Sequence, residues 1–286
     1  MDIRIVNTCN NNCLYCLEQE YRNREAFRAV EDITMEIQNN PQRDMITFYG
    51  WNPLLHPKLI DIIWFCKNLW FSSIGILSNT WWLSDSYLRE LIDTWLTSFG
   101  FYFHTFNQNR HAIIVNSGIS YSELIVNIKT LHKSSLSLKA VVHINRLNID
   151  GLYRDVANLY ASYGINTFEF INYFPFDRPY EKYHTLLGYN IIEKRKCINA
   201  LLKVIKKLNL RANFVKFSSI FFPVDDKYYN FQKWILDQIG QEDIIRLSPL
   251  QKDPPFCFTE KRCSWCFIRD NCLYYGNQNL ENRKDL

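Results

Sequence analysis

Apolar and aromatic runs alternate with helix-like segments along most of the chain. Strand-like runs occupy residues 3–7, 45–49, 74–78, 100–105, 138–145 and 166–172. Between them, apolar residues recur at helical spacing in residues 25–39, 57–70, 84–97, 119–133 and 150–163. Strands that alternate with helices are typical of βα units and a parallel sheet. The pattern therefore predicts an α/β fold, a partial (β/α)6 barrel of the TIM-like kind.

The regular alternation stops near residues 174–190, where prolines and a glycine interrupt the pattern. We therefore expect the barrel core to span residues 1–188 and a smaller C-terminal part to span residues 189–286. This second part begins with a predicted helix over residues 190–208, followed by a candidate strand in RANFVKF. A cysteine-rich lobe is expected at its end.

Composition and charge narrow the class of protein. The chain has 286 residues, of which 47% are hydrophobic and 16% aromatic, enough to bury a large core. No apolar run approaches the ~20 residues that a helix needs to cross a bilayer, and no apolar signal segment opens the chain. The net charge is only +4, so we infer no nucleic-acid partner. We expect a cytoplasmic protein with reduced cysteines and no membrane partner.

Three cysteines follow the first predicted strand at close spacing. Cys9, Cys13 and Cys16 lie in NTCNNNCLYC, a loop whose asparagines tolerate left-handed backbone conformations. Four cysteines saturate a [4Fe-4S] cluster, whereas three leave one iron free to bind a substrate or cofactor. Zinc would need a fourth ligand nearby, and the next histidine in the chain is His56. The motif therefore favours an iron-sulfur cluster with one open iron.

The CxxxCxxC spacing, with the aromatic Tyr15 just before the last cysteine, resembles the radical S-adenosylmethionine (SAM) superfamily. The resemblance implies that Cys9, Cys13 and Cys16 hold a [4Fe-4S] cluster whose free iron binds SAM. In that family, one electron from the cluster cleaves SAM to a 5′-deoxyadenosyl radical, which abstracts a hydrogen atom from the substrate. An external electron donor such as flavodoxin or ferredoxin is implied. By the same resemblance, Tyr15 would lie near the adenine.

Further matches stand at the ends of the next two predicted strands, where the chemistry of such barrels lies. YGWNP resembles the family's glycine-glycine-glutamate-proline turn, so Gly50 and Asn52 would approach the methionyl amino group. Trp51 and Asn52 depart from that pattern, and Asn52 offers an acceptor oxygen without a charge. Ser78 and Asn79 resemble a threonine-asparagine-glycine that lies beneath the cofactor. Without the resemblance, YGWNP is also compatible with an ordinary strand-to-helix turn.

Later strand ends supply candidates by position. The fourth strand ends at His104 or Thr105, where relatives usually place a serine near the ribose or the methionyl group. Asn145 ends the fifth strand and is a candidate for the ribose hydroxyls, as is Asn148. A single histidine at a strand end is more often structural, so His104 keeps a structural alternative. The sequence identifies no hydrogen donor or general base.

A second cysteine set lies near the end of the chain, at Cys257, Cys263, Cys266 and Cys272. Four thiolates at this spacing can close a tetrahedral site, which suits structural zinc as well as a [4Fe-4S] cluster. The CxxC followed by five residues and a cysteine resembles the auxiliary-cluster signature of the SPASM and twitch extensions. Gly276 stands where a full SPASM domain would place another cysteine. The resemblance thus implies one auxiliary [4Fe-4S] cluster, with zinc as the alternative.

Three functions follow from these patterns. Auxiliary-cluster lobes of this kind are common among peptide-maturing relatives, so the resemblance implies a radical oxidoreductase that modifies a peptide or small protein. A second hypothesis keeps the radical chemistry but assigns a sugar or aminocyclitol as the substrate. A third, from another class, is a zinc-stabilised binding protein without catalysis, motivated by Trp51 and Asn52. Two further cysteines, Cys66 and Cys197, fall in predicted helices, and Cys66 is most simply a buried hydrophobe.

Overall fold

The computed structural model describes residues 1–16, 26–50, 52–116, 121–172, 183, 186–189 and 191–215. The first cysteine motif lies within these ranges. The predicted auxiliary-cluster cysteines Cys257, Cys263, Cys266 and Cys272 lie outside the described residues, as does Trp51.

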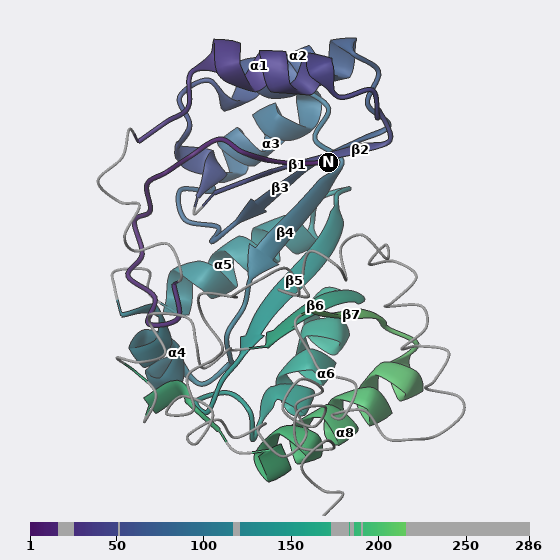
Figure 1. Ribbon diagram of the computed structural model, residues 1–286. Helices are drawn as coiled ribbons and strands as arrows, with labels where there is room; N and C mark the ends of the chain where they lie inside the picture. Colours follow the sequence, from purple (N-terminus) through teal and green to yellow (C-terminus); the bar gives the residue numbers. More distant parts are fainter. Residues whose placement is uncertain are drawn as a thin grey trace, which may run out of the picture.

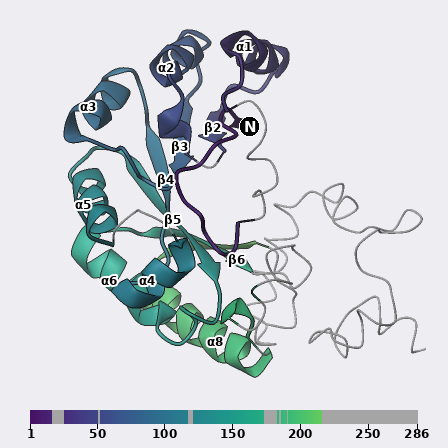
Figure 2. The same ribbon diagram turned by 90° about the vertical axis from the view of Figure 1, so that its left-hand side faces the viewer.

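Seven parallel strands form one sheet in sequence order. They are β1 (Asp2–Arg4), β2 (Met45–Tyr49), β3 (Ser73–Ser78), β4 (Ser98–Tyr102), β5 (Ser137–Ile144), β6 (Thr167–Asn172) and β7 (Arg211–Val215). The sheet is curled, with the helices on its convex side and the strands lining the opposite side (Figures 1 and 2). This half-barrel confirms the predicted α/β partial-barrel fold.

Helices connect the strands in the order that the pattern predicts. They are α1 (Val30–Asn39), α2 (Leu59–Asn68), α3 (Asp85–Asp93), α5 (Tyr121–His132), α6 (Leu152–Tyr163) and α8 (Ile191–Leu208). Two short elements were not predicted, the 3-10 helix η2 (Pro53–Leu55) and the helix α4 (Gln108–Val115). In α4 the exposed Ile113 stands beside the buried Ile114 and Val115, so its apolar residues do not follow a single helical stripe.

The half-barrel contains one strand more than the six that were assigned to it from the sequence. The segment RANFV, expected in the C-terminal part, forms β7 and pairs in parallel with β6, from Thr167 opposite Arg211 to Ile171 opposite Val215. Helix α8 packs against α6, as the outer helices of such a barrel do. Because a long connection and a helix separate it from β6, this predicted strand was not assigned to the barrel sheet. The division at residue 188 stays a prediction, because most of the chain beyond it lies outside the described residues.

Successive residues along the strands point alternately to an apolar, buried face of the sheet and to a polar face. The convex face is apolar and almost fully buried, and it includes Ile46, Phe48, Phe99, Phe101, Phe168 and Phe170. The opposite, concave face carries polar side chains, among them Lys139 and Glu169, whose Nζ and Oε2 lie 2.9 Å apart. This two-residue period is expected for strands that pack helices on only one side. The core therefore lies between sheet and helices, and the concave face is left for other contacts.

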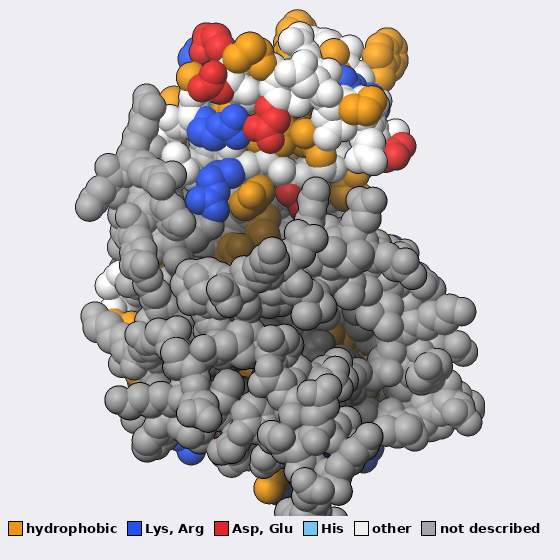
Figure 3. Space-filling model, in the orientation of Figure 1, with side chains coloured by type: hydrophobic (Ala, Val, Ile, Leu, Met, Phe, Trp, Pro, Cys, Tyr) orange, Lys and Arg blue, Asp and Glu red, His pale blue; other side chains and the backbone are white. Residues whose placement is uncertain are grey.

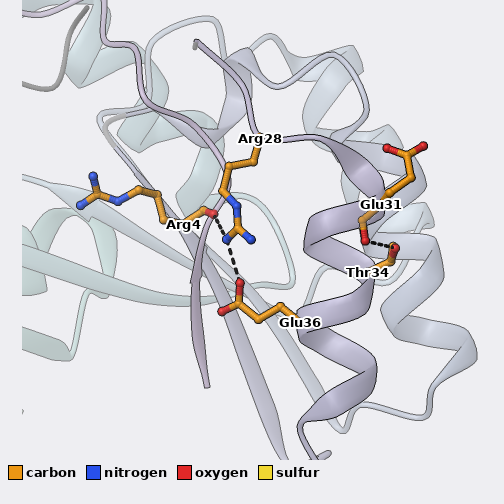
Figure 4. Close-up of polar contacts among 5 residues, drawn as sticks. All are labelled: Arg4, Arg28, Glu31, Thr34 and Glu36. Atoms are coloured by element: carbon orange, nitrogen blue, oxygen red, sulfur yellow. Dashed lines mark hydrogen bonds and ion pairs between the residues drawn. The ribbon is translucent and has the colours of Figure 1, made fainter. Parts of the chain in front are cut away.

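Arg28 fixes the strand that leads into the cysteine loop. Its guanidinium donates to the carbonyl oxygen of Arg4 at 2.9 Å and pairs with the Glu36 carboxylate at 2.8 Å (Figure 4). The hydroxyl of Thr34 donates to the carbonyl of Glu31 in the first turns of α1 (Figure 4). The two contacts of Arg28 join the end of β1 to α1. Among the described helices, none is long and apolar enough to span a membrane.

Candidate functional site

The first cysteine motif lies on the loop that leaves β1 at the carboxyl edge of the sheet. The amide of Ile5 donates to the carbonyl of Tyr49 at the end of β2, at 3.0 Å. Further along, the amide of Leu14 donates to the carbonyl of Ile114 in α4, at 2.9 Å. The loop is therefore held at both ends, and it crosses the mouth of the half-barrel. This is the edge at which the sequence predicted the chemistry.

The chemistry of the three thiols suits a cationic metal centre. Cys9, Cys13 and Cys16 are partly buried. Burial, and after it the charge that Cys9 and Cys16 would carry as thiolates, raises the pKa of the Cys13 thiol to about 12. Three thiolates this close together repel one another unless a positive charge lies between them. Bound iron supplies that charge, so the set fits a metal cluster better than a group of free thiolates.

The arrangement of the cysteines also distinguishes a site for a cluster from a site for a single metal ion. In the part of the chain that the structure describes, no three His, Cys, Asp or Glu side chains are arranged to hold one metal ion. A [4Fe-4S] cluster does not require them to converge, because each thiolate binds a different iron. The two other described cysteines, Cys66 and Cys197, are buried within α2 and α8. Cys66 is thus a core residue, as predicted.

Three side-chain amides and a hydroxyl join the cysteine loop to the ends of β2 and β3. Asn79 donates to the Oδ1 of Asn10 at 2.9 Å, and its Nδ2 lies 3.8 Å from the sulfur of Cys9. Asn52 is fully buried, and its Oδ1 accepts a hydrogen bond from Ser78 at 2.7 Å. The Nδ2 of Asn52 lies 3.5 Å from the Oδ1 of Asn10.

This network includes three of the predicted cofactor residues, Asn52, Ser78 and Asn79. The Oδ1 of Asn52, predicted to face a methionyl ammonium, already accepts from Ser78 and keeps one further lone pair. The sequence prediction did not include Asn127 of α5, which donates to the carbonyl of Thr80 at 2.9 Å and supports the same loop.

Gly50 brings the backbone of the YGWNP turn against the end of β1. Its φ is +107°, and a Cβ built on it would lie 2.3 Å from the carbonyl oxygen of Val6. Both the backbone angle and the close approach exclude a larger residue without movement of the chain. The turn therefore sits directly beside the strand that leads into the cysteine loop.

Aromatic rings surround Tyr15 on the β4 and β5 side of the site. The Tyr15 hydroxyl lies 3.4 Å from the Nε2 of His104, and the Tyr15 ring stacks on His143 with centroids 4.3 Å apart. Burial, followed by the nearby His111 and His143, lowers the pKa of His104 well below its ordinary value. Burial likewise raises the pKa of Tyr15 well above its ordinary value. Both rings are therefore neutral at physiological pH.

Two predicted cofactor residues are held by their own loops. The Oγ1 of Thr105 accepts from the amide of Asn107 at 3.1 Å, where α4 begins. The Nδ2 of Asn145 donates to the carbonyl of His143 at 3.1 Å, and its Oδ1 accepts from the amide of Leu147 at 2.9 Å. Both residues lie at the carboxyl edge, as predicted, but their hydrogen bonds shape the loops after β4 and β5.

His143 was missed in the sequence. It lies on β5 two residues after Val141 and four after Lys139, and alternates with the buried Val142 and Ile144. This period-two alternation places it on the concave face, and that signal was available from the sequence.

Because His104 is buried and neutral, we expect the stability of the folded protein to depend on pH. In the unfolded chain its pKa returns to about 6.5, so below that pH the unfolded state takes up a proton that the folded state resists. Stability therefore falls as the pH drops through this range. Urea unfolding of the cluster-free protein measures this effect. Between pH 7.5 and 5.5, the free energy of unfolding should fall by about 1.4 kcal/mol more in the wild type than in His104→Gln. Equal losses in the two proteins would contradict the burial of a neutral imidazole.

Comparison with known proteins is consistent with this geometry. Residues 3–155 match the family model described as the Radical SAM superfamily, which is more than half of the chain. No curated protein shows significant similarity to the chain.

Several solved structures share the fold at low identity. Streptococcus suis SuiB bound to the precursor peptide SuiA matches with a TM-score of 0.63 and 12% identity, over 87% of this chain and 54% of SuiB. Native anSMEcpe with bound AdoMet and the Kp18Cys peptide matches with a TM-score of 0.59 and 12% identity, over 74% of this chain and 63% of that one. HydG, a maturase of the [FeFe]-hydrogenase, matches with a TM-score of 0.59 and 13% identity, over 77% of this chain and 52% of HydG. The chain thus covers less than two thirds of each of these proteins.

Proposed function

Because the chain belongs to the radical SAM superfamily, we propose that Cys9, Cys13 and Cys16 hold a [4Fe-4S] cluster at the mouth of the half-barrel. The observation that carries this proposal is the position of three partly buried thiols on a loop fastened to β2 and α4. When bound, the cluster and SAM supply a 5′-deoxyadenosyl radical that abstracts a hydrogen atom from the substrate. An external one-electron donor, such as a flavodoxin or a ferredoxin, would reduce the cluster.

The asparagine network would hold the cluster loop in place beneath the methionyl end of SAM. Asn10 accepts a hydrogen bond from Asn79, which follows β3, and this bond joins the cysteine loop to the end of that strand. Gly50 allows the backbone at the end of β2 to approach the chain at Val6 closely. Asn52 contributes no charge, so we propose that it orients the loop, and that backbone groups bind the methionyl ammonium.

The ring cluster would bind the nucleoside end of SAM. Tyr15 and His143 are already stacked, and neutral aromatic rings suit an adenine, which is itself planar and uncharged. The Nδ1 of His104 is buried and makes no hydrogen bond within the described residues, so it is available to a ligand. We propose that His104 reaches the ribose or the methionyl group, and that Thr105 and Asn145 shape the walls of this pocket.

For the substrate we propose a peptide or a small protein. Support comes from two relatives in fold, SuiB and anSMEcpe, whose structures contain bound peptides. The concave face also offers paired charges, Lys139 and Glu169, that can contact polar side chains of an extended substrate. We further propose that Cys257, Cys263, Cys266 and Cys272 bind an auxiliary [4Fe-4S] cluster, with a zinc ion as the alternative.

Anaerobic reconstitution tests both parts of this proposal. Two cubic clusters predict about eight irons per chain, whereas one cluster and a structural zinc predict about four irons and one zinc. The reconstituted protein should convert SAM to 5′-deoxyadenosine when dithionite is added. Candidate precursor peptides encoded beside its gene should accelerate this reaction and should themselves change in mass. A protein that binds zinc but no iron would overturn the assignment.

A further inference from the structure

The outer surface at α2 and α3 exposes three tryptophans that the proposed chemistry does not use. Trp64, Trp70 and Trp95 are 58%, 86% and 51% exposed. Figure 3 shows hydrophobic side chains standing out at the upper end of the molecule, where α1 and α2 lie in Figure 1. Single exposed hydrophobic residues are normal on a protein surface, but a contiguous group of them marks an interaction site.

The three tryptophans belong to one patch. Trp64 and Lys67 line a groove of about 670 Å³ between α2 and α3. The Nζ of Lys67 lies 5.0 Å from the centre of the Trp95 ring, and the amide of Trp70 donates to the carbonyl of Lys67 at 3.0 Å. The loops that carry Trp70 and Trp95 are also joined, because the hydroxyls of Ser73 and Thr97 lie 2.9 Å apart. We call these three tryptophans and the groove the tryptophan patch.

Two of these tryptophans occupy unfavourable backbone positions. Trp70 and Trp95 have φ values of +63° and +93°, a region that bulky residues avoid. Each follows the C-cap residue of a helix that ends in a Schellman motif. At α2 the amide of Phe71 donates to the carbonyl of Cys66, and at α3 the amide of Leu96 donates to that of Leu91. Glycine or asparagine normally fills this position.

Other helices of the same chain follow the normal rule. Gly164 directly follows α6 with a φ of +62°, and Asn209 directly follows α8 with a φ of +51°. The fold therefore does not require tryptophan at such a position. Since Trp70 is 86% exposed, the packing of its side chain does not compensate for the energetic cost of its positive φ. Its side chain is better explained by a contact outside the described fold.

We infer that the tryptophan patch is the contact surface between two copies of this chain. The charges lining the groove have both signs: Asp61, Glu90 and Asp93 are acidic, and Lys67 and Arg89 are basic. A two-fold axis places each surface against itself, so the acidic residues of one copy can face the basic residues of the other. A partner with one dominant charge would find no such match.

The size of the exposed surface agrees with this assignment. At about 200 Å² for each tryptophan side chain, the three exposed fractions leave roughly 400 Å² of aromatic surface in contact with solvent. A standard interface buries about 800 Å² on each partner, and tryptophan is among the residues that dominate binding energy. The tryptophans alone would provide half of such an interface.

The position of the patch leaves the reaction site open. Trp70 and Trp95 precede β3 and β4, so they lie at the amino-terminal edge of the sheet. The cysteine loop lies at the opposite, carboxyl edge. Helices α2 and α3 are on the convex side of the half-barrel (Figure 2). Two copies joined at this patch would therefore each keep an accessible mouth.

Replacing Trp70 by glycine tests the inference with the full-length, anaerobically reconstituted protein. Sedimentation velocity should show a concentration-dependent dimer for the wild type and an at least ~10-fold weaker dimer for Trp70→Gly. The wild-type melting temperature should rise with protein concentration, because association stabilises the folded state, and that of the variant should not. At the lowest concentration the variant should melt about 2 °C higher, since glycine suits the positive φ.

Asn209→Gly is the matched control, because it makes the same kind of backbone change at the end of α8 and should leave dimerisation unchanged. A wild type that stays monomeric at ~100 μM would overturn the inference, whether a different partner or another part of the same chain covers the patch. So would a dimer that survives Trp70→Gly. A variant that melts lower and associates normally would show instead that Trp70 stabilises the monomer.

Discussion

The Cys13→Ala variant should form no 5′-deoxyadenosine above background when it is incubated with SAM and dithionite. Cys13 is partly buried, burial raises the pKa of its thiol, and it lies between the other two cysteines in the loop. Without it, two thiolates remain for a cluster that needs three protein ligands and one open iron. Changes in the outer shell of a metal site typically cost ~10–100-fold, so loss of a direct ligand should exceed that range.

A buried cysteine elsewhere in the chain provides the control for this variant. Cys66 is fully buried in α2, at a distance in sequence from the cysteine loop, and its replacement by alanine removes only packing. Cys66→Ala should keep the wild-type iron content and SAM cleavage. Iron analysis and electron paramagnetic resonance of the reduced protein report on the cluster itself. Full turnover by Cys13→Ala, with Cys66→Ala as the reference, would contradict the proposed ligand set.

The parts of the fold that were predicted correctly depend on short-range periodicity. Each strand from β2 to β6 is a run of apolar or alternating residues followed within a few positions by a helical stripe, and these patterns are local. β7 was predicted as a strand but not as part of the barrel, because its five residues follow the connection after β6 and the 18-residue helix α8. No local signal in RANFV distinguishes a seventh barrel strand from the first strand of another domain. Only the pairing with β6 decides that question.

The candidate site divides in the same way between local and non-local information. The spacing of Cys9, Cys13 and Cys16 identifies a metal motif without any knowledge of the fold, because all three lie within eight positions. The partners of Asn52 cannot be identified in this way, since its hydrogen bond to Ser78 joins residues 26 apart in the chain. Asn52 was expected to face the cofactor, and its buried position among other loops became visible only when three strand ends were assembled.

The Gly50→Ala variant should lose about 4 kcal/mol of folding free energy, from an unfavourable φ and a backbone clash together. The φ of +107° already disfavours any residue with a Cβ. The added methyl would lie 2.3 Å from the carbonyl oxygen of Val6, which belongs to the backbone and cannot rotate away. Relief would require β1 and the YGWNP turn to separate, and that movement would displace the cysteine loop. We therefore expect reduced iron incorporation as well as reduced stability.

A second glycine with a positive φ separates these two effects. Gly164 has a φ of +62°, but no heavy atom lies within 4 Å of its hypothetical Cβ. Gly164→Ala should therefore cost only about 1 kcal/mol, the backbone contribution, and should keep the wild-type iron content. Urea unfolding of both variants, with iron counted after reconstitution, gives the comparison. Equal losses of stability, or full iron incorporation in Gly50→Ala, would mean that the contact between Gly50 and Val6 does not position the cysteine loop.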